Sequence, residues 1–179
     1  MLKGDVLLVS GSLRRGSYNA ALLREAAKEL PSGVGHVWLD GIAGLPPYCE
    51  DQEGEGLPAA VERLRRTIAA AEAILIATPE YNGSIPGGVK NVIDWASRPF
   101  PDNAWRDKPV GVIGASTGIF GAVWAQAEVR KSLGLAGAQV IDAELAVGSA
   151  QDAFLPSGAL RDPGLATGLR DVVAALVDA

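Results

Sequence analysis

The chain has 179 residues, of which 48% are hydrophobic and 21% charged, and its formal net charge is −5. This length and composition predict one folded domain over residues 1–179 and argue against disorder. The negative charge disfavours nucleic acid and acidic membrane surfaces as partners, and no apolar run reaches the ~20 residues that a membrane helix needs, so we expect no membrane insertion.

The chain contains one cysteine and one histidine. Cys49 cannot form an internal disulfide, which fits a reducing, cytoplasmic location. His36 has no neighbours in sequence that would complete a metal site or a Ser-His-Asp triad. We therefore expect no metal site and no catalytic side chain.

Short apolar runs typical of buried strands alternate with helical patterns throughout the chain. The predicted elements in chain order are a strand over 5–10, a helix over 18–30, a strand over 34–39, a helix over 57–71, a strand over 73–78, a helix over 87–96, a strand over 109–115, a helix over 121–133, a short strand over 139–142 with 145–147 as its continuation, and a helix over 162–177.

Five strands alternating with about five helices predict an α/β fold in which helices cover both faces of a parallel sheet. The strand order that suits this number is the flavodoxin-like 2-1-3-4-5, a three-layer sandwich. In that topology a ligand binds at the carboxyl ends of the strands, where the order reverses between strands 1 and 3. The loops after these two strands are the most unusual in the sequence.

The loop after the first strand, residues 10–19, combines serine, glycine, arginine and asparagine and leads into a helix. The N–H groups of a first helical turn have no intrahelical partner and favour an anion. Arg14 adds a charged fork suited to phosphate oxygens, and Ser12, Ser17 and Asn19 add polar donors. The spacing matches neither a Gly-x-Gly-x-x-Gly nor a Walker loop. An ordinary turn with a helix cap is the alternative interpretation.

The loop after the third strand lies in the segment 78–95, which reads Thr-Pro-Glu-Tyr-Asn-Gly-Ser-Ile-Pro-Gly-Gly-Val-Lys-Asn-Val-Ile-Asp-Trp. Its prolines stiffen the chain, and Gly83 permits the close approach of a flat ligand. The backbone of residues 80–82 could face the edge of a heteroaromatic ring. A simple turn is again the alternative, and we expect Trp95 in the core. A third loop of small residues, 115–121, follows the fourth strand at the same edge of the sheet.

These three segments resemble the NADPH-dependent FMN reductase family, which includes chromate, quinone and azo-dye reductases. Gly11, Ser12, Arg14, Ser17 and Asn19 match the family's phosphate loop, and residues 78–95 match its ring loop almost completely. The resemblance weakens after about residue 145. One departure is the segment 121–124. Family members close to the chromate and quinone reductases often have a Gly-Gly and an arginine just before Ala-Gln, whereas this chain has Gly121-Ala122-Val123-Trp124, and the bulky Trp124 leaves the acceptor preference open.

The resemblance implies a non-covalent FMN, NADPH or NADH as electron donor, a small-molecule electron acceptor, and a homodimer or homotetramer. It places Ser12, Arg14, Ser17, Tyr18 and Asn19 around the FMN phosphate. It places Pro79, Glu80, Tyr81, Asn82 and Gly83 along the isoalloxazine, with Ser116, Thr117 and Gly118 completing the pocket.

These observations lead to the hypothesis of a ping-pong oxidoreductase that passes hydride from NAD(P)H through FMN to a quinone, flavin, azo compound or metal oxyanion such as chromate. Two alternatives remain open. One is a flavodoxin-type electron carrier without NAD(P)H activity, and the other is a flavin-free regulatory domain with the same fold.

Overall fold

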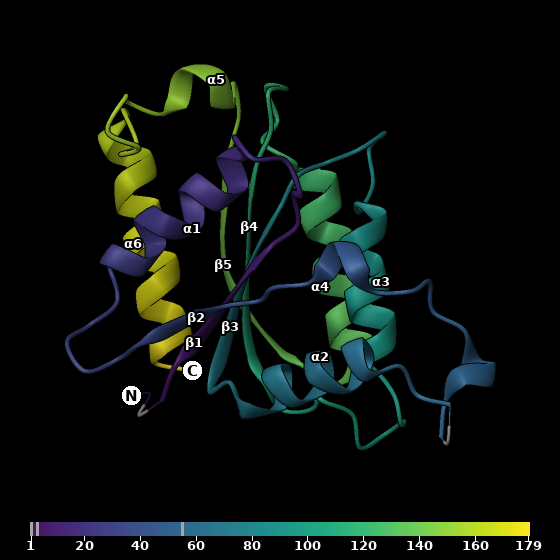
Figure 1. The fold of residues 1–179 in the computed structure, drawn as a ribbon. Coiled ribbons are helices and arrows are strands. Elements are labelled where there is room, and N and C mark those ends of the chain that lie inside the picture. Colours follow the sequence, from purple (N-terminus) through teal and green to yellow (C-terminus); the bar gives the residue numbers. More distant parts are fainter. Residues whose placement is uncertain (1, 3, 55) are drawn as a thin grey trace.

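A computed structural model describes residues 2, 4–54 and 56–179 of the chain and places five parallel strands in the order β2-β1-β3-β4-β5 (Figure 1). The strands are β1 (Val6–Ser10), β2 (His36–Trp38), β3 (Ala73–Thr78), β4 (Pro109–Ala115) and β5 (Gln139–Val147). The longer helices are α1 (Tyr18–Lys28), α2 (Ala59–Ala70), α3 (Gly87–Ala96), α4 (Val123–Ala136) and α6 (Pro163–Val177). Short elements are η1 (Ile42–Gly44), η2 (Glu50–Gln52) and α5 (Ala150–Ala153). The predicted fold class and strand order are confirmed.

Helices cover both faces of the sheet, with α1 and α6 on one side and α2, α3 and α4 on the other (Figure 1). Each side has its own apolar cluster, because successive residues of a strand point to opposite faces. Leu7 and Ile74 face the α2–α4 side, whereas Leu8 and Leu75 face the α1–α6 side. Trp95 is fully buried in the first cluster, as expected. β3 is buried at all six of its residues, which is why its sequence is a continuous apolar run.

The carboxyl ends of β1, β3, β4 and β5 lie next to one another because the strands are parallel and closely in register. Ser10 pairs with Ala77, Thr78 pairs with Gly114, and Ala115 pairs with Val147. The loops after these strands therefore begin side by side at one edge of the sheet. None of the helices in the described residues has the length and apolar character needed to cross a bilayer.

Several element boundaries differ from the sequence predictions. β2 is three residues long instead of six, because it is an edge strand that is largely exposed to solvent. α4 begins at Val123 rather than at residue 121, since Gly121 and Ala122 both have positive φ angles, 61° and 65°. β5 is one continuous strand whose pairing with β4 shifts register between Val110 and Val112. That irregularity accounts for the broken apolar pattern over residues 139–147.

Candidate active site

The loops after β1, β3 and β4 surround a hollow of about 300 Å³ at the carboxyl edge of the sheet. No two of these loops are adjacent in sequence, so the site is assembled by the strand order. The residues that line the hollow are Ser12, Arg14, Tyr18, Asn19, Pro79, Glu80, Tyr81, Ala115, Ser116 and Thr117.

The first wall of the hollow is the N-terminus of α1. Ser17 caps this helix, and its hydroxyl accepts a hydrogen bond from the Ala20 N–H at 3.1 Å. The N–H groups in the first turn of a helix have no intrahelical partners, and the Ser17 hydroxyl supplies a partner for the N–H of Ala20. The first turn contains no acidic residue, so the positive end of the helix dipole is not neutralised there.

An aromatic side chain supports the guanidinium of Arg14. The Arg14 Cζ atom lies 5.3 Å from the centroid of the Tyr18 ring, which is a cation–π distance. The Tyr18 ring is stacked on Phe154 in turn, with centroids 5.9 Å apart and an angle of 11° between the planes. Phe154 follows α5, in the part of the chain where the sequence resemblance is weak. The pair of rings holds the charge of Arg14 over the mouth of the hollow.

Asn19 lies in the hollow, but its side chain is already occupied. Its amide nitrogen donates to the Ala115 carbonyl and its amide oxygen accepts from the Ala115 N–H, both at 2.9 Å. Asn19 is only 3% exposed. The side chain therefore ties α1 to the end of β4, and what Asn19 offers an anion is its backbone N–H.

The loop after β3 folds back as a tight hairpin. Tyr81 and Ser84 exchange two backbone hydrogen bonds of 3.2 Å around the turn residues Asn82 and Gly83. These two residues have φ angles of 55° and 73°, as a two-residue Asn-Gly turn requires. The turn exposes Tyr81 at the rim of the hollow and directs Asn82 and Gly83 away from its lining.

Two carboxylates fasten this hairpin to α4. Glu80 accepts hydrogen bonds at 3.1 Å from the N–H groups of Trp124 and Ala125, so it caps a helix whose own N-cap residue, Ala122, has no capping side chain. Glu128 accepts from the Ser84 hydroxyl at 2.6 Å and from the Ile85 N–H at 3.2 Å. The hydrogen bond from Ser84, followed by that from Ile85, lowers the pKa of Glu128 below its ordinary value.

The loop after β4 rests against the end of β5. The Ser116 N–H donates to the Val147 carbonyl, and the Gly118 N–H donates to the Ser116 hydroxyl at 3.1 Å. Among the described residues of the loop, the N–H groups of Thr117, Ile119, Phe120 and Gly121 have no protein acceptor, and of these residues Thr117 lines the hollow. A Cβ on Gly121 would lie 2.6 Å from the backbone of Ala146, so glycine is required for this close packing.

Most of the residues predicted from sequence thus meet in one hollow. Ser17 lies beneath it as the cap of α1, and Asn82, Gly83 and Gly118 shape the adjoining turns without lining it. Sequence reasoning missed Ala115 and Phe154, and it did not foresee the hydrogen bonds of Asn19 and Glu80. In the described part of the chain, no group of three His, Cys, Asp or Glu side chains is arranged to hold a metal ion.

The chemistry of the lining fits FMN. A helix N-terminus, Arg14 and the hydroxyl of Ser12 form a set of donors for a phosphate at one end. Pro79, Tyr81 and Thr117 present a stiff backbone and a flat side chain at the other end, as a planar heteroaromatic ring needs.

Comparison with known proteins agrees with this geometry. The family model of NADPH-dependent FMN reductase matches residues 5–152. An NAD(P)H-dependent FMN reductase of Pseudomonas aeruginosa is 48% identical over 158 residues, which are 88% of this chain and 84% of that protein. A quinone reductase of Pseudomonas putida is 39% identical over 159 residues, 88% of this chain and 85% of that one.

A solved structure extends the similarity to almost the whole chain. FerB, a flavoenzyme NAD(P)H:(acceptor) oxidoreductase from Paracoccus denitrificans, superposes with a TM-score of 0.86 at 36% identity and covers 97% of this chain and 95% of its own. The fold and the site define a flavodoxin-like oxidoreductase. The chain belongs to the NADPH-dependent FMN reductase family, whose members use FMN and NAD(P)H.

Proposed function

We propose that this protein is a ping-pong oxidoreductase that transfers hydride from NAD(P)H through FMN to a small-molecule acceptor. The single observation that carries this proposal is the hollow at the edge of the sheet, where the N-terminus of α1, with no acidic residue in its first turn, adjoins the loops after β3 and β4. When bound, FMN accepts a hydride from NAD(P)H and gives electrons to the acceptor. We propose that the whole chain serves as one FMN-binding domain.

The phosphate end of FMN is assigned to the first loop. The Arg14 guanidinium and the Ser12 hydroxyl are the side chains that reach the hollow, and the α1 N-terminus supplies N–H groups. Ser17 acts here by capping α1, and Tyr18 acts by supporting the Arg14 guanidinium. Asn19 contributes its backbone N–H, because its side chain is bound to Ala115. An FMN phosphate would also neutralise the positive end of the helix dipole.

The ring end is assigned to the loops after β3 and β4. Pro79, Glu80, Tyr81, Ser116 and Thr117 line the hollow there, and Asn82, Gly83 and Gly118 form the adjoining turns. The Thr117 N–H is the donor placed to bind a carbonyl oxygen or ring nitrogen that becomes more negative on reduction. Glu80 and Glu128 hold the hairpin in position through α4 and therefore act as positioning residues.

The acceptor class is proposed from two aromatic side chains, Tyr81, which lines the hollow, and Trp124, whose N–H is bound by the lining residue Glu80. Tyr81 and Trp124 are both about half exposed, and Trp124 is in edge contact with Phe120 at a centroid distance of 5.1 Å. Exposed aromatic side chains beside the hollow favour the binding of a flat organic acceptor. We therefore propose that the acceptor is a quinone rather than an azo compound, free flavin or chromate. The relatives named as quinone reductases support this order.

We further propose a cytoplasmic homodimer or homotetramer. Ile119, Phe120 and Trp124 are 75%, 56% and 52% exposed, and such a cluster of large apolar side chains is typical of an interface. Light scattering of the purified protein tests this assembly.

Steady-state kinetics test the proposed mechanism. The rate of NADPH oxidation is measured with benzoquinone at several fixed NADPH concentrations. If NADPH and benzoquinone bind in turn to the same open face of the flavin, double-reciprocal plots of the rate show parallel lines. Intersecting lines would contradict the ping-pong order, and a flavin-loaded protein with no NAD(P)H oxidation would favour an electron carrier.

A further inference from the structure

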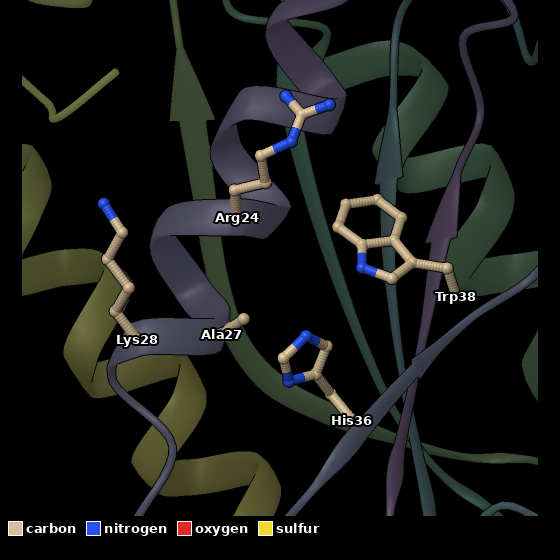
Figure 2. Close-up of a pocket in the computed structure, with 5 residues that line it drawn as sticks. All are labelled: Arg24, Ala27, Lys28, His36 and Trp38. Carbon is tan, nitrogen blue, oxygen red and sulfur yellow. The ribbon is translucent and has the colours of Figure 1, made fainter. Parts of the chain in front are cut away.

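A second hollow, of about 500 Å³, lies between α1 and the edge strand β2, away from the flavin site. Its lining is Arg24, Ala27, Lys28, His36 and Trp38 (Figure 2). His36 and Trp38 are two residues apart on one strand and so point to the same face, toward α1. Ala27 has a short side chain, which leaves room between the helix and the strand.

The lining combines cations with one aromatic ring. The Arg24 guanidinium lies 5.8 Å from the centroid of the Trp38 ring. Figure 2 shows the His36 ring below the Trp38 ring and next to Ala27. Lys28 stands one helical turn after Arg24 and forms an ion pair with Glu25, in which the Lys28 side chain is 62% exposed and that of Glu25 16%. Such a surface pair contributes little and yields readily to a phosphate. An aromatic face beside cationic donors suits a ligand with both a flat base and a phosphate.

A third hollow, of about 310 Å³, connects this site to the flavin site. It is lined by Arg24 and Trp38 at one end and by Ser12, Arg14 and Arg15 at the other. Ser12 and Arg14 also line the flavin hollow, so three depressions follow one another along the α1 edge. The carboxylate in the connecting hollow is that of Asp40, which can accept hydrogen bonds from sugar hydroxyls.

The charge of this edge is opposite to that of the protein as a whole. The chain has a net charge of −5, yet Arg14, Arg15, Arg24 and Lys28 all stand on or beside these hollows, where they outnumber the carboxylates of Asp40 and of Glu25, the partner of Lys28. A concentrated positive field on an acidic protein steers anions to that place.

We propose that the hollow between α1 and β2 binds the phosphorylated adenosine end of NADPH. The adenine lies beside Trp38, and the 2′-phosphate is bound by Arg24, Lys28 and His36. The proposal rests on the proposed function, since it assigns the donor's remote end, and it predicts that NADPH is preferred to NADH.

The test uses 2′,5′-ADP, a fragment that carries the 2′-phosphate but no nicotinamide. Its binding to FMN-loaded protein is measured by calorimetry for the wild type, for the double variant Arg24→Gln with Lys28→Gln, and for a charge-matched control, Arg66→Gln with Arg170→Gln. All four side chains are exposed, so we expect both double variants to fold like the wild type, which their circular dichroism spectra check. We expect the Kd to rise at least tenfold in the first variant only.

Two further measurements identify the ligand's parts. Trp38→Leu should weaken 2′,5′-ADP, because stacking on the indole is lost, while leaving inorganic phosphate binding unchanged. The double variant should lower kcat/KM for NADPH at least tenfold and leave that for NADH within about twofold.

The outcomes separate this inference from the proposed function. Wild-type protein that does not bind 2′,5′-ADP, or a double variant that binds it equally well, overturns the inference even if NADPH is oxidised. The inference is also overturned if inorganic phosphate competes with 2′,5′-ADP at equal concentration, since the site would then recognise only the charge of the ligand and not its adenosine. Binding that is lost in the double variant supports the site, even if neither donor is oxidised and the proposed function fails.

Discussion

Asn19 and Ala115 are 96 residues apart in sequence, yet the side-chain amide of the first forms both hydrogen bonds with the backbone of the second. The contact joins the first turn of α1 to the last residue of β4. These are the elements that carry the proposed phosphate and ring ends of the FMN site. One buried side chain therefore sets the distance between the two halves of the site.

Replacement of Asn19 by alanine should destabilise the protein and weaken FMN binding together. The N–H and carbonyl of Ala115 would remain buried without partners, at a cost of about 1–3 kcal/mol for each group. Urea unfolding of the FMN-free protein measures this loss. Asn19→Asp keeps an acceptor for the Ala115 N–H but sets an oxygen against the Ala115 carbonyl in a buried place, so it should not restore the wild-type stability. Equal stability of all three proteins would contradict the role given to Asn19.

Arg14 and Arg15 are neighbours that should differ sharply in their effect on FMN. Arg14 lines the hollow proposed for FMN, whereas Arg15 lines only the connecting hollow. A charge-assisted hydrogen bond is worth about 1.5–3 kcal/mol, so Arg14→Gln should raise the Kd of FMN roughly 10-fold to 100-fold. Arg15→Gln is the matched control and should change it less than threefold. Quenching of flavin fluorescence gives both constants, and an equal effect of the two variants would refute the assignment.

The hairpin turn should require glycine at residue 83. Its φ of 73° is left-handed, which costs an L-residue with a side chain about 1–2 kcal/mol. Gly83→Ala should therefore lower the thermal stability. Gly134→Ala is the control, since Gly134 lies within α4 with open space around its Cβ position and alanine favours a helix. It should leave the stability unchanged or raise it. A Gly83→Ala protein as stable as the wild type would argue against the turn.

Acid should release the hairpin from α4. The pKa of Glu128 is lowered in the folded protein, chiefly by the hydrogen bond from Ser84. A carboxyl group whose pKa is lower in the folded state stabilises that state above its unfolded pKa, and this contribution is lost as the pH falls through the folded pKa. The stability difference between the wild type and Glu128→Gln should therefore be present at pH 7 and shrink toward zero as the pH falls below the lowered pKa.

Thermal unfolding of the two proteins across that pH range measures the difference. Glu62→Gln serves as a control, because Glu62 forms only an exposed pair with Arg66, with 3.8 Å between charged atoms. The stability of Glu62→Gln should differ little from that of the wild type at every pH. If the stability difference between the wild type and Glu128→Gln persisted unchanged in acid, the hydrogen bonds of the Glu128 carboxylate could not be its cause.

The parts of the fold that were predicted from sequence are those determined by local patterns. β3, α3 and β4 have the predicted bounds, because continuous apolar runs or a helical period end there at proline, glycine or polar residues. The start of α4 was wrong because Gly121 and Ala122 are both left-handed, and Gly121 packs closely against the backbone of Ala146 and Val147 in β5. α5, a helix of four residues, gives no periodic signal at all.

The candidate site shows the same division. The three loops were found because each follows a buried strand and has unusual composition. The roles of Asn19 and Glu80 could not be predicted, since their partners lie 96 and 44–45 residues away and are backbone atoms, which leave no trace in a sequence pattern. Phe154 was missed for a related reason, because only the tertiary fold brings it onto Tyr18.

The visible spectrum of the FMN-loaded protein, followed without oxygen while NADPH or NADH is added, tests most directly whether this chain is a reductase. The proposed function predicts that a stoichiometric amount of at least one donor bleaches the oxidised flavin bands, and that added quinone restores them. Bound flavin that neither donor bleaches would contradict the reductase and favour an electron carrier, and a protein that binds no FMN would contradict both.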